Sequence, residues 1–173
     1  MKKETNINKK SEHEKNDAKY AVAGIVLGAV ALISVLAAVF LPIIKINADF
    51  NKIFDTMGAM HNPQIIITDM KADNVFAPVK GEVSVDDTSS ALKIIGDITA
   101  IADGFEYDGR DETVGAWDLR VKVKDGEREA TFYLSDGKIS YVNKGVKYIF
   151  VASDDKTLEK YRDFYSEIAS LVK

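Results

Sequence analysis

The sequence contains no cysteine, and this absence excludes several kinds of chemistry at once. Without a thiol the chain has no disulfide, no zinc–thiolate site and no cysteine nucleophile. It also lacks the cysteine to which a lipid anchor would be attached. The two histidines, His13 and His61, lie far apart in the sequence, so we expect no histidine pair for a metal ion or for a serine–histidine arrangement.

Other catalytic and metal-binding patterns are missing or weak. Ser90 and Lys93 match the S-x-x-K pattern of penicillin-binding proteins, but Ser153 and Lys156 match it as well, so chance explains both. Neither standard glycine loop for phosphate is present. Five acids lie close together, but their spacing does not fit a calcium-binding EF-hand loop: Asp103, Glu106, Asp108, Asp111 and Glu112. We therefore expect no cofactor, no metal site and no catalytic residues, with an enzyme as the less favoured reading.

A long uncharged segment is the strongest feature that is present. Residues 21–44 form 24 consecutive positions without a charge. As a helix they would be about 36 Å long, enough to cross a hydrocarbon layer of about 30 Å. We predict a transmembrane helix over residues 20–45. A cleavable signal peptide is the alternative, with Val35-Leu36-Ala37 as its cleavage site, but the apolar run continues to Ile43.

The distribution of lysines predicts the orientation of this helix. Six lysines precede it and two follow it closely: Lys2, Lys3, Lys9, Lys10, Lys15 and Lys19 before, Lys45 and Lys52 after. Because positively charged flanks stay in the cytoplasm, we expect residues 1–19 to form a disordered cytoplasmic tail. The remainder of the chain would then lie outside the cell membrane.

Two glycines in the apolar segment are spaced for helix packing. Gly24 and Gly28 are one helical turn apart, which lets the backbones of two membrane helices approach closely. This spacing predicts a homo-oligomer formed through the span.

Residues 46–173 are predicted to form one α+β domain with helices packed on an antiparallel sheet. After Pro42, an apolar stripe from Ile46 to Met60 predicts a helix that ends near His61. This helix would pack on its own domain, lie on the membrane surface or pair with another helix. Strands follow at 64–68 and 80–85, and a helix begins near Thr88. Residues 103–115 read as a loop. A last helix begins at Ser153.

The segment from Trp117 to Val151 carries the clearest pattern. Trp117, Leu119, Val121 and Val123 alternate with polar residues, so we assign all four to the buried face of a strand. Turns at Asp125-Gly126, Asp136-Gly137 and Asn143-Lys144-Gly145 separate three further alternating segments. Together they predict a four-stranded antiparallel meander.

The outward face of this meander is not uniformly polar. Tyr133, Val142, Ile149 and Val151 are assigned to it together with basic residues. Such a face is either covered by the domain's own helices or forms an apolar patch that meets a protein partner.

Charge and composition narrow the function. Residues 45–173 carry 17 basic and 23 acidic side chains, a net charge of −6, which disfavours nucleic-acid binding. An exported domain without cysteine is typical of a bacterium. We therefore expect a non-enzymatic, membrane-anchored interaction or sensing domain. The alternatives are a small hydrolase or inhibitor of the cell envelope, and a structural subunit of a membrane assembly.

Overall fold

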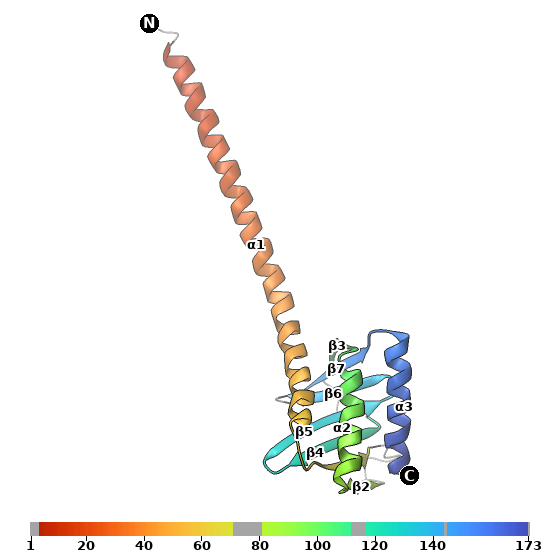
Figure 1. Ribbon diagram of the computed structural model, residues 1–173. Helices are drawn as coiled ribbons and strands as arrows, with labels where there is room; N and C mark the ends of the chain where they lie inside the picture. Colours follow the sequence, from red (N-terminus) through yellow and green to blue (C-terminus); the bar gives the residue numbers. More distant parts are fainter. Residues whose placement is uncertain (1–3, 71–80, 112–116, 144, 173) are drawn as a thin grey trace. The chain divides into compact units, whose positions relative to one another are not determined.

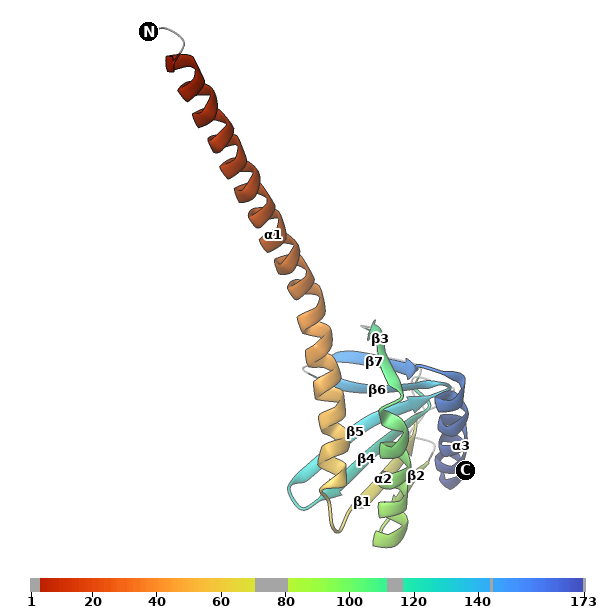
Figure 2. The ribbon, with the colours of Figure 1, turned by 45° about the horizontal axis from the view of Figure 1, so that its top comes forward.

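The computed structural model describes residues 4–70, 81–111, 117–143 and 145–172. The chain divides into two units, Met1–Ile44 and Lys45–Lys173, which are described separately. The described residues form three helices and seven strands. Figure 1 labels all of them except β1, which Figure 2 labels. The fold is α+β, with one long apolar helix near the N-terminus and an antiparallel sheet, as the sequence predicts.

The helix α1 spans Glu4–Gly58 and contains Pro42. The prediction of a separate helix after Pro42 is therefore wrong. A proline removes one backbone N–H and hence one intrahelical hydrogen bond, and the helix continues on both sides. The segment Lys19–Gly58 is long and apolar enough to cross a membrane: its most apolar 18 residues have a mean hydropathy of 2.7 and are not buried. A signal sequence meets the same criterion, and the assignment of residues 1–19 to a cytoplasmic tail stays a prediction.

The sheet of the second unit has seven strands, not the four predicted. Its order is β2-β1-β4-β5-β6-β7-β3, and all neighbours are antiparallel. The predicted meander forms its centre as β4 (Leu119–Asp125), β5 (Arg128–Ser135), β6 (Lys138–Asn143) and β7 (Val146–Ala152). The hairpin of β1 (Gln64–Asp69) and β2 (Glu82–Val85) extends it beside β4.

The strand β3 (Phe105–Asp111) occupies residues that the sequence analysis assigned to a loop. It pairs with β7 at the edge of the sheet, and its register shifts between Tyr107 and Gly109. The shift places Tyr107 opposite Phe150 and Arg110 opposite Tyr148, so the alternation of buried and exposed residues is broken. An edge strand with such a bulge carries no regular two-residue pattern, which explains the error.

Glycines form the turns of the meander, as predicted. Gly126, Gly137 and Gly145 have φ angles of +59°, +72° and +78°, a region that other residues adopt at a cost. The first turn is shifted by one residue, because Asp125 pairs with Arg128 and belongs to β4. The carboxylate of Asp125 accepts hydrogen bonds from the backbone N–H groups of His61 and Asn62 at 2.7 and 3.2 Å. Arg128 donates to the carbonyl of Ala59. The β4–β5 hairpin thus holds the segment that follows α1.

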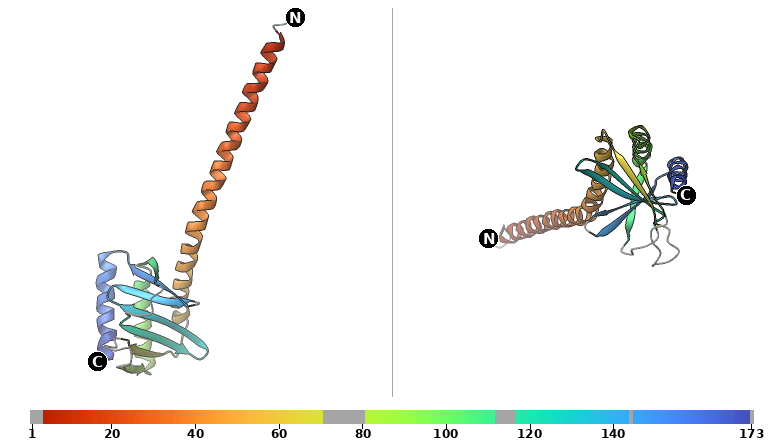
Figure 3. Two further views of the ribbon diagram at one scale, coloured as in Figure 1. Left: turned by 180° about the vertical axis from the view of Figure 1, so that it is seen from behind. Right: turned by 90° about the horizontal axis from the view of Figure 1, so that it is seen from below.

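The core lies between one face of the sheet and three helical segments: the C-terminal part of α1, α2 (Thr88–Ala102) and α3 (Asp155–Leu171). Figures 2 and 3 show these segments on the same side of the sheet. Ile46, Phe50, Phe54 and Met57 of α1 are buried, and the ring of Phe50 stacks on that of Phe150 at 3.8 Å between centroids. Of the three roles weighed for this stripe, packing on its own domain is confirmed.

Acidic N-caps begin both remaining helices. Asp87 caps α2 by accepting from the N–H of Ser90, and Asp154 caps α3 by accepting from the N–H of Thr157. The cap of α3 is thus one residue after the predicted Ser153. The hydroxyl of Ser90 also donates to Asp87 at 2.7 Å, and it is the main reason why the pKa of Asp87 is lowered, followed by the N–H of Ser90. The N–H of Thr157 is the main reason why the pKa of Asp154 is lowered, since it favours the ionised form.

Candidate interaction surface

The outer sheet face is the face opposite the core, and none of the helices in the described part of the chain covers it (Figure 3). The register places Tyr133, Ser140 and Ile149 side by side in one row across β5, β6 and β7. This row lies between Val142 and Val151: Val142 is opposite Lys147, and Val151 is opposite Lys138. The four residues of the predicted patch therefore share one face, but they do not form one compact cluster.

Exposure differs among the patch residues. Val142 is 46% exposed, while Tyr133, Ile149 and Val151 are half-buried. Ser140, between Tyr133 and Ile149, is fully buried, and its hydroxyl has no hydrogen-bond partner among the described residues. Side chains of neighbouring strands thus cover the middle of the face, and Val142 is the apolar side chain that solvent reaches most easily.

Trp117 was assigned to the buried core face, and this assignment is wrong. Its ring lies 6.4 Å from that of Tyr133, and the ammonium of Lys147 lies 5.2 Å above it. Both neighbours belong to the outer sheet face. Because β4 begins at Leu119, the alternation of the strand does not extend back to Trp117. Trp117 nevertheless remains 8% exposed, so it serves as packing for this face and not as an open platform.

Basic side chains on β4 form a stripe on the outer sheet face, and each of them lies near an acidic or polar side chain of a neighbouring strand. Lys122 and Lys124 lie 2.7 and 3.5 Å from the carboxylate of Glu129 on β5. The hydrogen bond from Lys122 is the main reason why the pKa of Glu129 falls below its usual value. Arg120 donates to the hydroxyl of Thr68 at 3.1 Å and lies 3.9 Å from Glu82.

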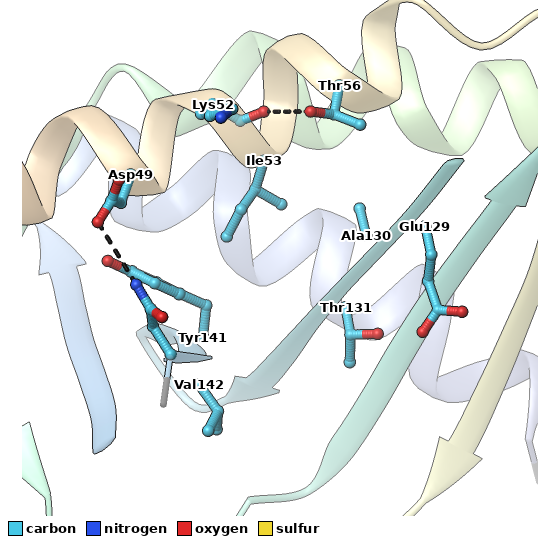
Figure 4. A pocket seen from close by; sticks show the side chains of 10 residues that line it. Asp49, Lys52, Ile53, Thr56, Glu129, Ala130, Thr131, Tyr141 and Val142 are labelled. Carbon is cyan, nitrogen blue, oxygen red and sulfur yellow. Dashed lines mark hydrogen bonds between the residues drawn. The ribbon is translucent and has the colours of Figure 1, made fainter. Parts of the chain in front are cut away.

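A cleft opens beside Val142, where β5 and β6 separate (Figure 4). The two strands pair only from Tyr133↔Ser140 to Ser135↔Lys138, although both continue beyond Tyr133 and Ser140. The cleft has a volume of about 320 Å³. It is lined by residues of α1, β5 and β6: Asp49, Lys52, Ile53, Thr56, Glu129, Ala130, Thr131, Tyr141, Val142 and Asn143.

The side chain of Ile53 points from α1 into this opening, between Ala130 and Tyr141 (Figure 4). The hydroxyl of Tyr141 donates to the carbonyl of Ile46 at 3.3 Å, and burial raises the pKa of Tyr141 to about 12. It therefore stays a neutral donor at physiological pH. The amide of Asn143 lies 3.5 Å from the carboxylate of Asp49. These contacts join β6 to α1 and leave the edge facing β5 open.

The weak sequence motifs do not assemble into a site. The ammonium of Lys93 lies 2.8 Å from the carboxylates of both Asp97 and Glu167, and hydrogen bonds to these groups raise the pKa of Lys93. It is thus held in its charged form and not as a base for Ser90. Within the described residues no three metal-ligating side chains converge, and Glu112 lies outside them.

The glycines of the apolar segment have open surroundings. A Cβ atom added at Gly24 or at Gly28 would meet no atom within 4 Å in the described chain. The unit contributes no packing partner of its own at these positions, so their role in an oligomer stays a prediction.

No family model, no curated protein and no solved structure matches this chain.

Proposed function

We propose that this chain is a membrane-anchored interaction module whose α+β domain lies outside the cytoplasm. The anchor is supported by the unburied apolar segment of α1, which is long enough to cross a bilayer. The orientation is supported by six lysines before this segment against two shortly after it. Length also favours an anchor over a signal peptide, whose apolar core has roughly 7–15 residues.

The binding role rests on one observation: the outer sheet face carries apolar and basic side chains but no covering helix among the described elements. A sheet face of this kind is either solvated and polar or covered by another layer. Tyr133, Ile149 and Val151 are neither strongly polar nor fully buried, and Val142 is open to solvent. A protein partner at the membrane surface is the covering that we propose.

A unique cysteine tests the topology, because the natural chain has none. Ser84 is exposed on β2, so a Ser84→Cys variant should react with a membrane-impermeant maleimide on intact cells. Ser11→Cys, in the predicted cytoplasmic tail, is the matched control and should react only after lysis. Protection of position 84 until lysis would refute the topology. Loss of residues 1–37 from the mature protein would identify a signal peptide instead.

Photo-crosslinking in cells tests the partner. A photoreactive residue at Tyr133 or Ile149 should give a discrete crosslinked protein, identified by mass spectrometry. The same residue at Glu159, exposed on α3 on the other side of the domain, should not give that product. If neither outer position captures a protein while the domain remains folded, the patch hypothesis is wrong.

A second candidate is a structural subunit of a membrane assembly that self-associates through the span. Its support is the spacing of Gly24 and Gly28, which lie one helical turn apart in the apolar segment. Such a subunit would migrate well above 19.1 kDa in mild detergent.

A further inference from the structure

The incomplete pairing of β5 with β6 leaves a strand edge free inside the sheet. The last pair is Tyr133↔Ser140, and five residues of β5, Arg128–Phe132, continue beyond it. They amount to roughly 16 Å of strand. Had the hairpin continued in the same register, Thr131 would lie opposite Val142. Both residues instead line the cleft.

The register also shows where the backbone groups of Thr131 point. Antiparallel neighbours alternate between pairs that exchange hydrogen bonds and pairs that do not. On the β4 side, the pair Asp125↔Arg128 closes the two-residue turn, so Lys122↔Thr131 falls on a non-bonded position. The N–H and C=O of Thr131 therefore point away from β4 and into the cleft.

The same reasoning applies to Val142 on the other wall. The pair Asn143↔Val146 flanks the turn to β7, so Val142↔Lys147 falls on a non-bonded position. The N–H and C=O of Val142 therefore point toward β5. In the described part of the chain, the β5–β6 pairing does not reach either residue. Two strand edges with alternating donors and acceptors thus face each other across a cleft of about 320 Å³.

An extended polypeptide backbone matches this arrangement, because it presents donors and acceptors with the same repeat on both of its sides. We propose that the cleft between β5 and β6 receives an extended segment of the partner protein, which adds a strand between them. This proposal rests on the proposed function and names the mode of recognition at the same surface. The side chains that point inward would meet Ile53 and Ala130, so apolar residues are favoured at every second position.

Peptide selection on the full chain in lipid nanodiscs tests the proposal. A phage library of random eight-residue peptides is panned against the protein, and the recovered peptides are synthesised for measurement of Kd. We expect Thr131→Pro to weaken binding about tenfold, since it removes one N–H that faces the peptide. Thr131→Val keeps that N–H, so it should raise Kd less than Thr131→Pro does. Proline is tolerated at this position because the N–H makes no bond to β4.

A second measurement does not depend on the proline variant. Peptides methylated on alternate backbone nitrogens are titrated into the natural protein. Because alternate N–H groups of an inserted strand face β5 and β6, both methylation patterns should weaken binding about tenfold. The proposal is overturned if no recovered peptide is sensitive to its own methylation. It is also overturned if Thr131→Val and Thr131→Pro have equal effects.

The outcomes separate this proposal from the function on which it rests. Crosslinks from Tyr133 or Ile149 in cells, without any cleft-dependent peptide, would retain the interaction module and reject strand addition. Cleft-dependent peptides together with a protected cysteine at position 84 would retain strand addition and reject the topology. Recovery of peptides that match this chain's own sequence would assign the cleft to a second copy and reject a different partner.

Discussion

Replacing Phe50 by alanine should destabilise the domain strongly, although this residue lies only a few positions after the apolar segment. Its side chain is 2% exposed, its ring stacks on Phe150 at 3.8 Å, and it meets Phe54 edge-on at 4.9 Å between centroids. Removing a buried phenylalanine costs about 3–5 kcal/mol, which includes the cavity that remains. A domain with a free energy of unfolding of about 5–15 kcal/mol would lose much of its stability.

The assay is urea unfolding of the full chain in detergent, followed by the fluorescence of Trp117, the single tryptophan. With a dependence on urea of about 2 kcal/mol per molar, the midpoint should fall by about 2 M. Phe40→Ala is the matched control: Phe40 lies in the apolar segment and is 54% exposed, so the midpoint should not change. Equal midpoints for Phe50→Ala and the natural protein would refute the core role of α1 and favour a helix on the membrane or against another protein.

Three further predictions concern other parts of the chain. Tyr161→Phe should lower the free energy of unfolding by about 0.5–1.5 kcal/mol in the same assay, because the buried hydroxyl lies 2.6 and 2.7 Å from two carbonyl oxygens of the β5–β6 hairpin. An unchanged midpoint would show that these hydrogen bonds do not stabilise the domain. Gly24→Leu with Gly28→Leu should leave unfolding unchanged but abolish any oligomer seen by size-exclusion chromatography in mild detergent, and an oligomer that survives would not form through these glycines. The pKa of Asp125 is lowered because the N–H groups of His61 and the next residue donate to its carboxylate. Its contribution to the free energy of unfolding is therefore present above about pH 4 and is lost as the pH falls further. Asp125→Asn should flatten the pH dependence of unfolding below about pH 4. An identical profile would contradict this reasoning.

The elements with strong local signals could be predicted from the sequence. The alternation of apolar and polar residues predicted the strands β4 to β7, and glycines with positive φ lie in the turns between them. The stripe Ile46–Met60 was identified as helical because spacings of three and four residues place its members on one face. In each of these segments the local pattern and the tertiary structure require the same residues.

The errors arise where tertiary contacts override the local pattern. β3 was missed because its bulge at Tyr107 and Gly109 destroys the alternation. Trp117 was placed on the wrong face because the alternating sequence pattern extends two residues before Leu119, where β4 begins. Pro42 predicted a boundary, but its helix continues. The two-residue period of a strand was enough to assign the four patch residues to the correct face, since alternate residues of a strand share a face.

The cleft could not be predicted from side-chain patterns at all. Thr131 and Val142 have ordinary strand residues on both sides, and the turn at Gly137 predicts a hairpin that continues past them. Ile53, which lines the opening between the strands, comes from a helix far away in the sequence. Only the three-dimensional arrangement shows which backbone groups lack a neighbouring strand.

The contact between Tyr141 and Ile46 joins residues 95 positions apart and has a consequence for biosynthesis. At about 5–20 residues per second, the ribosome needs roughly 5–20 s to make the strands on which the end of α1 packs. During this interval the apolar stripe that contains Phe50 and Phe54 has no partner and is open to aggregation. The stripe therefore stays without its packing partners until β7 has been synthesised, and folding of this domain can be completed only after nearly the whole chain is available.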